Sequence, residues 1–392
     1  MSREGVPWRS ATVWLTVAVA MVAPLDMAPM GPTLPVVASA FGVSSARAGL
    51  VITAYALPGV VAAPLIGVFA DRYGRQRVLV PCLVGFGLAG VAITLAPSFR
   101  ALLALRVVQG CLGGSIFASL AYTLVGDVYE GTTRNAVMGV ATAAVGLTAA
   151  AGPALGGALA DVSWRAPFAL YGLCVVVGLA VLVGLDAPAP AEADADDGSY
   201  LREAVAVLPL SRIGAVYGLT FLGYTFFFGG VLAGIPFLLA DTYGLSASRI
   251  GILITLASGV TVLVSMLNGR FAHYLTNEGM LVTSFLAYGA GLALVWLSGS
   301  PMGVVAGLVV FGVGHGVFQP SMAASLSSIG PERFRGGILS LRTSVVLAAG
   351  AAGPPAFTLP ASAIGYPVLY LAAGVVALLA GVAGVAVADV RR

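Results

Sequence analysis

One acidic side chain stands deep inside an apolar run near the start of the chain. Of the sixteen acidic residues, we place only Asp26, in MVAPLDMAPMGPTLP, well within a membrane-length segment. An ionised carboxylate in hydrocarbon is costly, so it must be paired, hydrated in a cavity or protonated for part of the time. Burial favours the neutral acid, whereas a nearby guanidinium favours the carboxylate. Asp26 is therefore a candidate for loading and releasing a proton. The alternative is a structural carboxylate that caps or kinks a proline-rich helix.

Arg106, in LLALRVVQGCLGG, is the cation that we expect near Asp26. An arginine within a membrane span needs an acid, backbone carbonyls or water within reach of its guanidinium. We expect both residues near mid-depth or slightly toward the outer side. The alternative for Arg106 is a side chain that snorkels to the outer interface.

A third charged feature is GVFADRYGRQR (Gly67–Arg77), a short hinge between two long apolar runs. Its two glycines, Gly67 and Gly74, permit close backbone packing and a sharp turn. Its charged residues stand where a membrane protein would meet water, and they are Asp71, Arg72, Arg75 and Arg77. The alternative is a solvated turn that only follows the charge rules of membrane topology.

The composition identifies the kind of molecule that must position these residues. With 59% hydrophobic and 9% charged residues and a mean hydropathy of +1.00, the chain is a polytopic membrane protein. A net charge of +3 gives no support for nucleic-acid binding. The chain has no lysine, so it has no GxxxxGK[ST] nucleotide loop, and we expect an ion gradient to supply any energy. We find no paired acids in a span, no His/Cys cluster and no Ser/His pair, so we expect no enzyme, metal or cofactor. The three cysteines lie in apolar runs as packing residues.

Apolar runs of about 20 residues, each long enough to cross a bilayer core, repeat along the chain. They must be helices, because lipid cannot satisfy unpaired backbone groups. We predict twelve spans, at residues 11–38, 47–69, 78–97, 101–125, 136–159, 166–185, 213–240, 249–269, 279–298, 302–327, 336–358 and 364–388. Thirteen arginines then fall on the inner side and four in outer loops, which places both termini in the cytoplasm. The polar segment 186–212 is expected to be a solvated linker between a six-helix bundle at 1–185 and another at 213–392.

The two bundles repeat in sequence. LPVVASAFGVSSARAGLVIT from Leu34 aligns with IPFLLADTYGLSASRIGILIT from Ile235, and VVQGCLGG from Val107 aligns with VVFGVGHG from Val309. Duplicated six-helix halves are the transporter arrangement in which a site forms near the midplane, between the repeats. We therefore expect an all-α membrane protein of two pseudo-symmetric six-helix bundles.

The hinge resembles the loop between the second and third helices of the major facilitator superfamily, G-x-x-x-D-R-x-G-R-[KR]. The residues that carry this resemblance are Gly67, Asp71, Arg72, Gly74 and Arg75, with Gln76 where a basic residue is usual. Three further stretches resemble the family's first-helix, fourth-helix and antiporter motifs. They are Leu25, Asp26, Leu34 and Pro35; then Arg106, Gln109 and Gly110; then Gly146, Gly152, Pro153, Gly156 and Gly157. With the repeat, the resemblance covers essentially the whole chain.

The resemblance implies a drug:proton antiporter of twelve helices. It gives Asp26 and Arg106 a role in proton coupling. It makes the hinge a state-dependent gate together with Asp127 and Arg134, with Arg75 meeting Asp127. The glycine motif of the fifth span marks exporters in the family, while ordinary small-residue packing is the alternative.

The substrate pocket is expected among aromatic and polar-tipped residues of the spans that face the cavity in the family. They are Tyr55, Gln109, Tyr122, Tyr224, Phe228, His315 and Gln319. His315 either titrates or contacts substrate, or it is a neutral packing residue. The mostly apolar set suits a moderately hydrophobic molecule and disfavours a sugar. We expect proton-coupled export of small molecules by a monomer in the plasma membrane. The alternatives are a uniporter or proton symporter for a metabolite, and a receptor-like relative without turnover.

Overall fold

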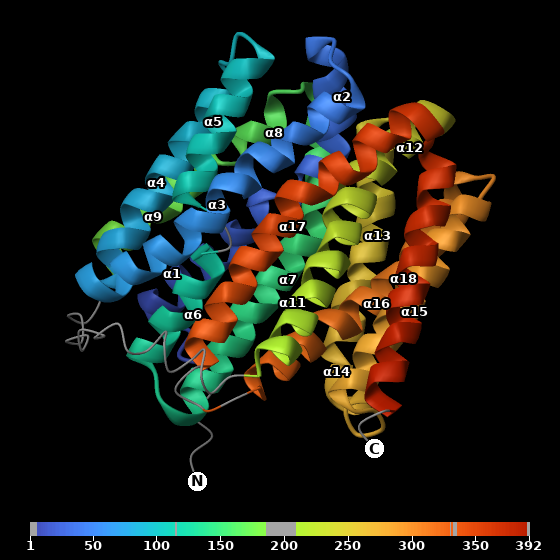
Figure 1. Ribbon diagram of the computed structural model, residues 1–392. Coiled ribbons are helices and arrows are strands. Elements are labelled where there is room, and N and C mark those ends of the chain that lie inside the picture. The colour runs from blue at the N-terminus through green and yellow to red at the C-terminus, as the bar shows by residue number, and fades with distance from the viewer. Residues whose placement is uncertain (1–5, 114–115, 186–208, 330, 332–334, 390–392) are drawn as a thin grey trace.

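The computed structural model describes residues 6–113, 116–185, 209–329, 331 and 335–389, and this part of the chain is helical without strands. Figure 1 shows a bundle of long, roughly parallel helices in two groups. The helices of the first half are α1 (Ala11–Val22), η1 (Ala23–Asp26), α2 (Met30–Phe41), α3 (Ser45–Tyr73), α4 (Arg75–Ile93), α5 (Phe99–Leu112), α6 (Ile116–Val128), α7 (Gly131–Val162), α8 (Ala166–Ala169) and α9 (Gly172–Gly184).

The second half repeats this order. Its helices are α11 (Leu210–Thr225), η2 (Phe226–Gly234), α12 (Ile235–Tyr243), α13 (Ala247–Met266), α14 (Asn268–Phe271), α15 (Asn277–Leu297), α16 (Pro301–Ser327), α17 (Arg335–Ile364) and α18 (Tyr366–Asp389). The linker predicted at 186–212 lies outside the described residues as far as 208, and α11 already begins at Leu210.

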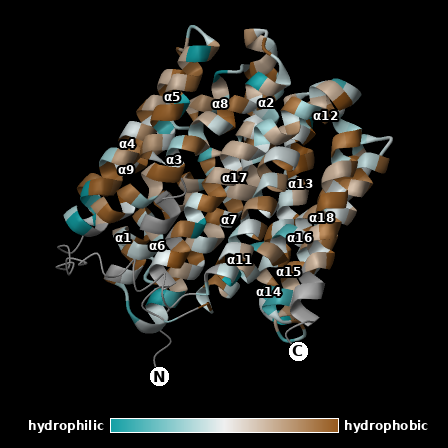
Figure 2. Cartoon of the chain, viewed as in Figure 1, coloured by the Kyte–Doolittle hydropathy of each residue, from teal (hydrophilic) through white to brown (hydrophobic). Residues whose placement is uncertain are grey.

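The prediction of a helical membrane protein is confirmed. Ten helical segments among the described residues are long and apolar enough to span a bilayer, and the bent pair from Ala11 to Phe41 makes an eleventh. The predicted fourth span corresponds to α5 and α6, on either side of residues 114–115, which are not described. The outer faces of α4, α9 and α18 are mainly apolar (Figure 2), as a surface in contact with lipid requires.

The first span is broken, and proline explains why. Pro24 and Pro29 have no amide hydrogen, so each removes a bond from the helical ladder. The chain responds with a 3₁₀ turn at Ala23–Asp26, and α2 leaves the break at 45° to α1. In the second half the corresponding stretch is the π-helix Phe226–Gly234, rich in glycine. Irregular backbone therefore stands at the same place in both repeats.

The two halves meet along two pairs of helices, α3 with α17 and α7 with α13. In the first pair, Thr53 Oγ1 donates to the carbonyl of Ala351 at 2.9 Å, and Ser344 Oγ donates to the carbonyl of Val60 at 3.0 Å. In addition, α2 packs against α12 and η2, at the end of the bundle opposite to the start of α1 and the end of α18 (Figure 1).

Candidate functional site

Asp26 ends the 3₁₀ turn and is buried, with 9% of its surface exposed. Its carboxylate oxygen Oδ2 accepts a 2.6 Å hydrogen bond from the hydroxyl of Tyr55, which is fully buried in α3. Asp26 therefore faces the interior of the first bundle and not lipid. Tyr55, which the sequence suggests for the substrate pocket, lies against the proposed proton carrier.

Arg106 lies beside Asp26 in α5 and is fully buried. Its Nη2 donates to the backbone carbonyl of Asp26 at 3.2 Å, and Tyr171 Oη donates to the same carbonyl at 3.2 Å. The guanidinium also stacks over the ring of Tyr55, 4.6 Å from its centroid. The broken helix explains this contact: Met30 N–H bonds to another carbonyl at the break, so the Asp26 carbonyl is available to side chains.

The remaining donors of Arg106 also find neutral acceptors. Its Nε donates to the carbonyl of Val51 at 3.1 Å, and its Nη1 donates to Gln109 Oε1 at 2.9 Å. Gln109 is fully buried and in turn donates to the carbonyl of Phe86 at 3.2 Å. Across the described residues, the carboxylate of Asp26 has no guanidinium or ammonium nitrogen within 4.0 Å. Arg106 thus holds the backbone of the break, and its charge is solvated by dipoles instead of by an ion pair.

The glycine motif of the fifth span lies in α7, between this break and the second half. A Cβ on Gly152 would collide with Ala28, and one on Gly156 would collide with Pro29, so both glycines let α7 approach the broken span. On the neighbouring face, Gly157 lies against Ala247 of α13. Pro153, whose carbonyl lies against Gly251, belongs to the same contact. Gly146 lies about two turns earlier in α7, where an added Cβ would be 3.6 Å from the side chain of Val262. The motif therefore packs α7 against both the break and the second half.

Asp161, near the end of α7, makes a contact that we did not predict from the sequence. Its two carboxylate oxygens accept hydrogen bonds from the backbone N–H groups of Ala247 (2.9 Å) and Ser248 (3.2 Å). These are first-turn donors of α13, whose N-cap residue, Ser246, makes no side-chain capping bond. An acid from one half therefore caps a helix of the other half.

The hinge residues lie at the opposite end of the bundle. Gly74 has a φ of 96°, as a sharp turn between α3 and α4 requires, while nothing lies within 4 Å of a Cβ on Gly67. Arg75 Nη1 donates to the carbonyl of Thr123 at 3.1 Å, one turn before Asp127 along α6. Arg72 and Arg134 are exposed. The side chains of Asp71 and Asp127 lie outside the described part of the chain, so the Arg75–Asp127 contact stays a prediction.

Four of the residues suggested for substrate binding come together in the second half. Tyr224 and Phe228 stack at 5.9 Å, and Tyr224 meets the edge of His315 at 5.6 Å. His315 is 2% exposed, with Nδ1 2.7 Å from Tyr288 Oη, and its Nε2 accepts from Gln319 Nε2 at 2.9 Å. Tyr122 is half-buried in α6 and packs on the core of the first half.

The sequence reasoning missed Arg342 in α17. Its Nη2 donates to the hydroxyl of Tyr224 at 3.2 Å, which joins a charge to the aromatic cluster. The signal was available, because Arg342 is an arginine inside a predicted span, as Arg106 is. The partners of His315 and Arg106, Tyr288 and Tyr171, gave no such signal, because a tyrosine in an apolar run is unremarkable.

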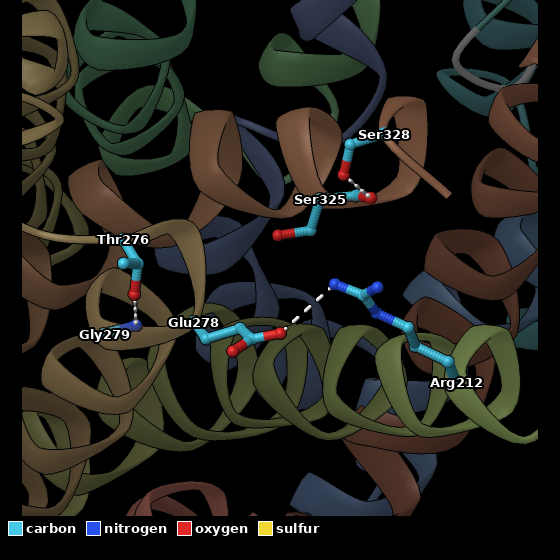
Figure 3. A network of polar contacts seen from close by, with 6 residues as sticks. All are labelled: Arg212, Thr276, Glu278, Gly279, Ser325 and Ser328. Carbon is cyan, nitrogen blue, oxygen red and sulfur yellow. Dashed lines mark hydrogen bonds and ion pairs between the residues drawn. The ribbon is translucent and has the colours of Figure 1, made fainter. Parts of the chain in front are cut away.

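A separate cavity of about 420 Å³ lies between α11, α15 and α18, and its lining is almost wholly apolar. At its rim Arg212 Nη2 donates to Glu278 Oε1 at 3.2 Å, close to where Thr276 caps α15 (Figure 3). Both charged side chains are nearly half exposed, so their ion pair contributes little stability. None of the residues of Asp26's network or of the aromatic cluster lines this cavity. We therefore place the candidate site at the Asp26 network and the aromatic cluster and not at this cavity.

A sequence model of the Major Facilitator Superfamily matches residues 16–273 and 215–392, so the matches together run from the first span to the end of the chain. The chain belongs to the major facilitator superfamily. This major facilitator is therefore a multi-pass membrane transporter of small molecules and not an enzyme.

Relatives of known type are similar over most of its length. The bacillibactin exporter of Bacillus subtilis is 25% identical over 357 residues, which cover 87% of each chain. The class G tetracycline resistance protein of Vibrio anguillarum is 29% identical over 320 residues, 79% of each chain. Among solved structures, a bacterial homologue of the human lysosomal transporter Spinster, inward-facing and unoccupied, superposes with a TM-score of 0.76 at 18% identity, over 99% of this chain and 96% of that one. This last similarity supports the fold alone.

Proposed function

We propose that this transporter exports small, moderately hydrophobic molecules in exchange for protons, by alternating access. Two of the similar proteins carry export or drug-resistance names, which supports efflux as the direction. The cluster of Tyr224, Phe228 and His315 supplies the apolar, aromatic surface that such molecules prefer.

The observation that carries proton coupling is the environment of Asp26. Its carboxyl is buried, accepts one hydrogen bond from Tyr55 and has no ion-pair partner among the described residues. A permanent ion pair would hold the acid in its charged form throughout the cycle. Here, burial favours the neutral acid, while the Tyr55 bond and the nearby charge of Arg106 favour the carboxylate. An acid balanced in this way can change its protonation state when its surroundings change.

The residues packed around Asp26 offer a route from a change in its protonation state to a movement of the helices. Arg106 and Tyr171 both donate to the carbonyl of Asp26, and the glycines of α7 pack this helix against the break on one side and against α13 of the second half on the other. A shift of the break on protonation would therefore reach the interface of the halves through α7. Arginine placement supports a cytoplasmic location for both termini, in the plasma membrane. The contacts of α7 with α13 then close the outer side, which leaves the hinge side as the entrance from the cytoplasm.

Export from inside-out vesicles tests the function. Vesicles with the wild-type chain and an acidic interior should accumulate a neutral hydrophobic dye such as Nile red, and collapse of the proton gradient should stop this accumulation. Asp26→Asn should abolish gradient-driven accumulation while dye binding to the purified protein stays within about twofold. Asp241→Asn, an exposed acid at the end of α12, is the matched control. Normal gradient-driven accumulation by Asp26→Asn would refute the proton role of Asp26.

A further inference from the structure

Arg342 carries a charge that the described structure does not neutralise. It lies seven residues into α17, within a segment apolar enough to span the membrane. One of its nitrogens donates to Tyr224 Oη, while its Nε is buried and has no hydrogen-bond partner. In the part of the chain that is described, no carboxylate lies within 4.0 Å of the guanidinium.

The hydrogen bonding of Arg342 differs from that of Arg106, the other arginine well within a predicted span. Arg106 directs its Nε, Nη1 and Nη2 to oxygen acceptors of the protein. An arginine stays charged in a protein, and an intramembrane charge without such partners is costly. A buried hydrogen-bond donor without an acceptor at a functional surface is best explained by a ligand that binds there and supplies the acceptor.

Arg342 is partly exposed and lies next to the interface between the halves. The tyrosine that it contacts lies fourteen residues into α11, about 21 Å along the helix from its start. The guanidinium group therefore lies inside the bundle and away from the ends of its helices. Tyr224 joins it to the aromatic cluster, in which Phe227 and His315 stack with centroids 4.6 Å apart. Ser344, two residues beyond Arg342, contacts the first half, so this stretch of α17 borders the interface between the halves.

We propose that Arg342 binds an anionic group of the transported molecule, and that the favoured substrates are aromatic carboxylates. Nε and the other free guanidinium donors bind the carboxylate, and the rings of Tyr224, Phe227 and Phe228 contact the apolar body. Guanidinium suits a planar carboxylate because its donors form a fixed fork. This inference rests on the proposed export function, for which it names the class of substrate.

The test compares two probes of equal shape, 1-naphthoate and 1-naphthamide, by equilibrium dialysis against the purified full chain. The wild type should bind the carboxylate at least about tenfold more tightly than the amide, since charge-assisted hydrogen bonds are the strong ones. Arg342→Gln should remove this preference, and Arg342→Lys should keep part of it. Arg249→Gln, which removes an exposed arginine of α13, should leave the preference unchanged.

A second measurement needs no variant and therefore does not depend on folding of the mutants. Phenylglyoxal modifies accessible arginines, and peptide mass spectrometry reports the modification of Arg342. Naphthoate should protect Arg342 from phenylglyoxal at concentrations at which naphthamide does not. Equal binding of the two probes, no binding of either, or equal protection overturns the assignment. Because neither measurement uses a proton gradient, proton-independent export with an intact carboxylate preference would overturn the coupling proposal alone.

Discussion

Asp161 should stabilise the state in which α7 and α13 are closed against each other. It is exposed at the end of α7, yet it supplies the N-terminal cap of a helix in the other half. Asp161→Ala removes two charge-assisted hydrogen bonds that exist only while the two helices are in contact. The substitution therefore destabilises the closed state relative to any state in which these helices separate.

The size of the effect follows from capping energies. Replacing an N-cap acid by alanine costs about 0.5–2 kcal/mol, typically about 1 kcal/mol. The exposure of Asp161 argues for the middle of this range, because water competes for its carboxylate. About 1 kcal/mol corresponds to roughly a fivefold shift in the equilibrium between closed and open states.

Distances between spin labels measure this shift directly. Labels at Pro97→Cys and Gly299→Cys, in a background without the three native cysteines, lie in exposed loops at the same end of the bundle, one in each half. The population with the longer distance should rise about fivefold in Asp161→Ala. Asp241→Ala, another exposed acid at that end, should leave it unchanged. An unchanged distribution in Asp161→Ala would mean that the contact does not hold the halves together.

Three further substitutions test other parts of the account. Gly156→Val should destabilise the protein by about 1–3 kcal/mol through overpacking, measured as a lower thermal midpoint of unfolding. Gly67→Ala, which points its methyl group into open space, should leave the midpoint unchanged. Equal midpoints for the two variants would contradict the packing role of Gly156. Tyr55→Phe cannot donate to Asp26, so gradient-driven dye export should fall by about tenfold, and an unchanged rate would remove Tyr55 from the mechanism. Arg75→Ala should slow turnover more than dye binding, and unaltered turnover would reduce the hinge to a signal for topology.

The sequence predicts the helical segments well because their signal is local. Apolar runs, prolines and charged turns each act over a few residues, so the described helices coincide with the predicted spans within several residues at most ends. The same holds for Gly74, whose positive φ is a property of the turn itself. The break after Val22 was not predicted, because residues 11–38 were read as one span and the prolines were considered only as a possible cause of a kink.

The candidate site depends on contacts between residues of different helices, and the type of a single residue does not predict which residues of other helices it meets. Proximity of Asp26 and Arg106 could be expected, since each needs a polar neighbour in hydrocarbon. That Arg106 binds the backbone carbonyl of Asp26 follows only from the freed acceptor of the broken helix. Tyr55 and Gln109 were assigned to the substrate pocket by their type, whereas their positions, fully buried against Asp26 and Arg106, favour a positioning role.

The central claim is that Asp26 changes its protonation state within the folded protein. Infrared difference spectroscopy of the purified chain during a pH titration measures this directly through the C=O stretching band of a protonated carboxylic acid. The account predicts a band that appears as the pH falls and is missing in Asp26→Asn. A spectrum in which the wild type and Asp26→Asn show the same titrating bands would mean that Asp26 keeps one charge state, and would contradict the account.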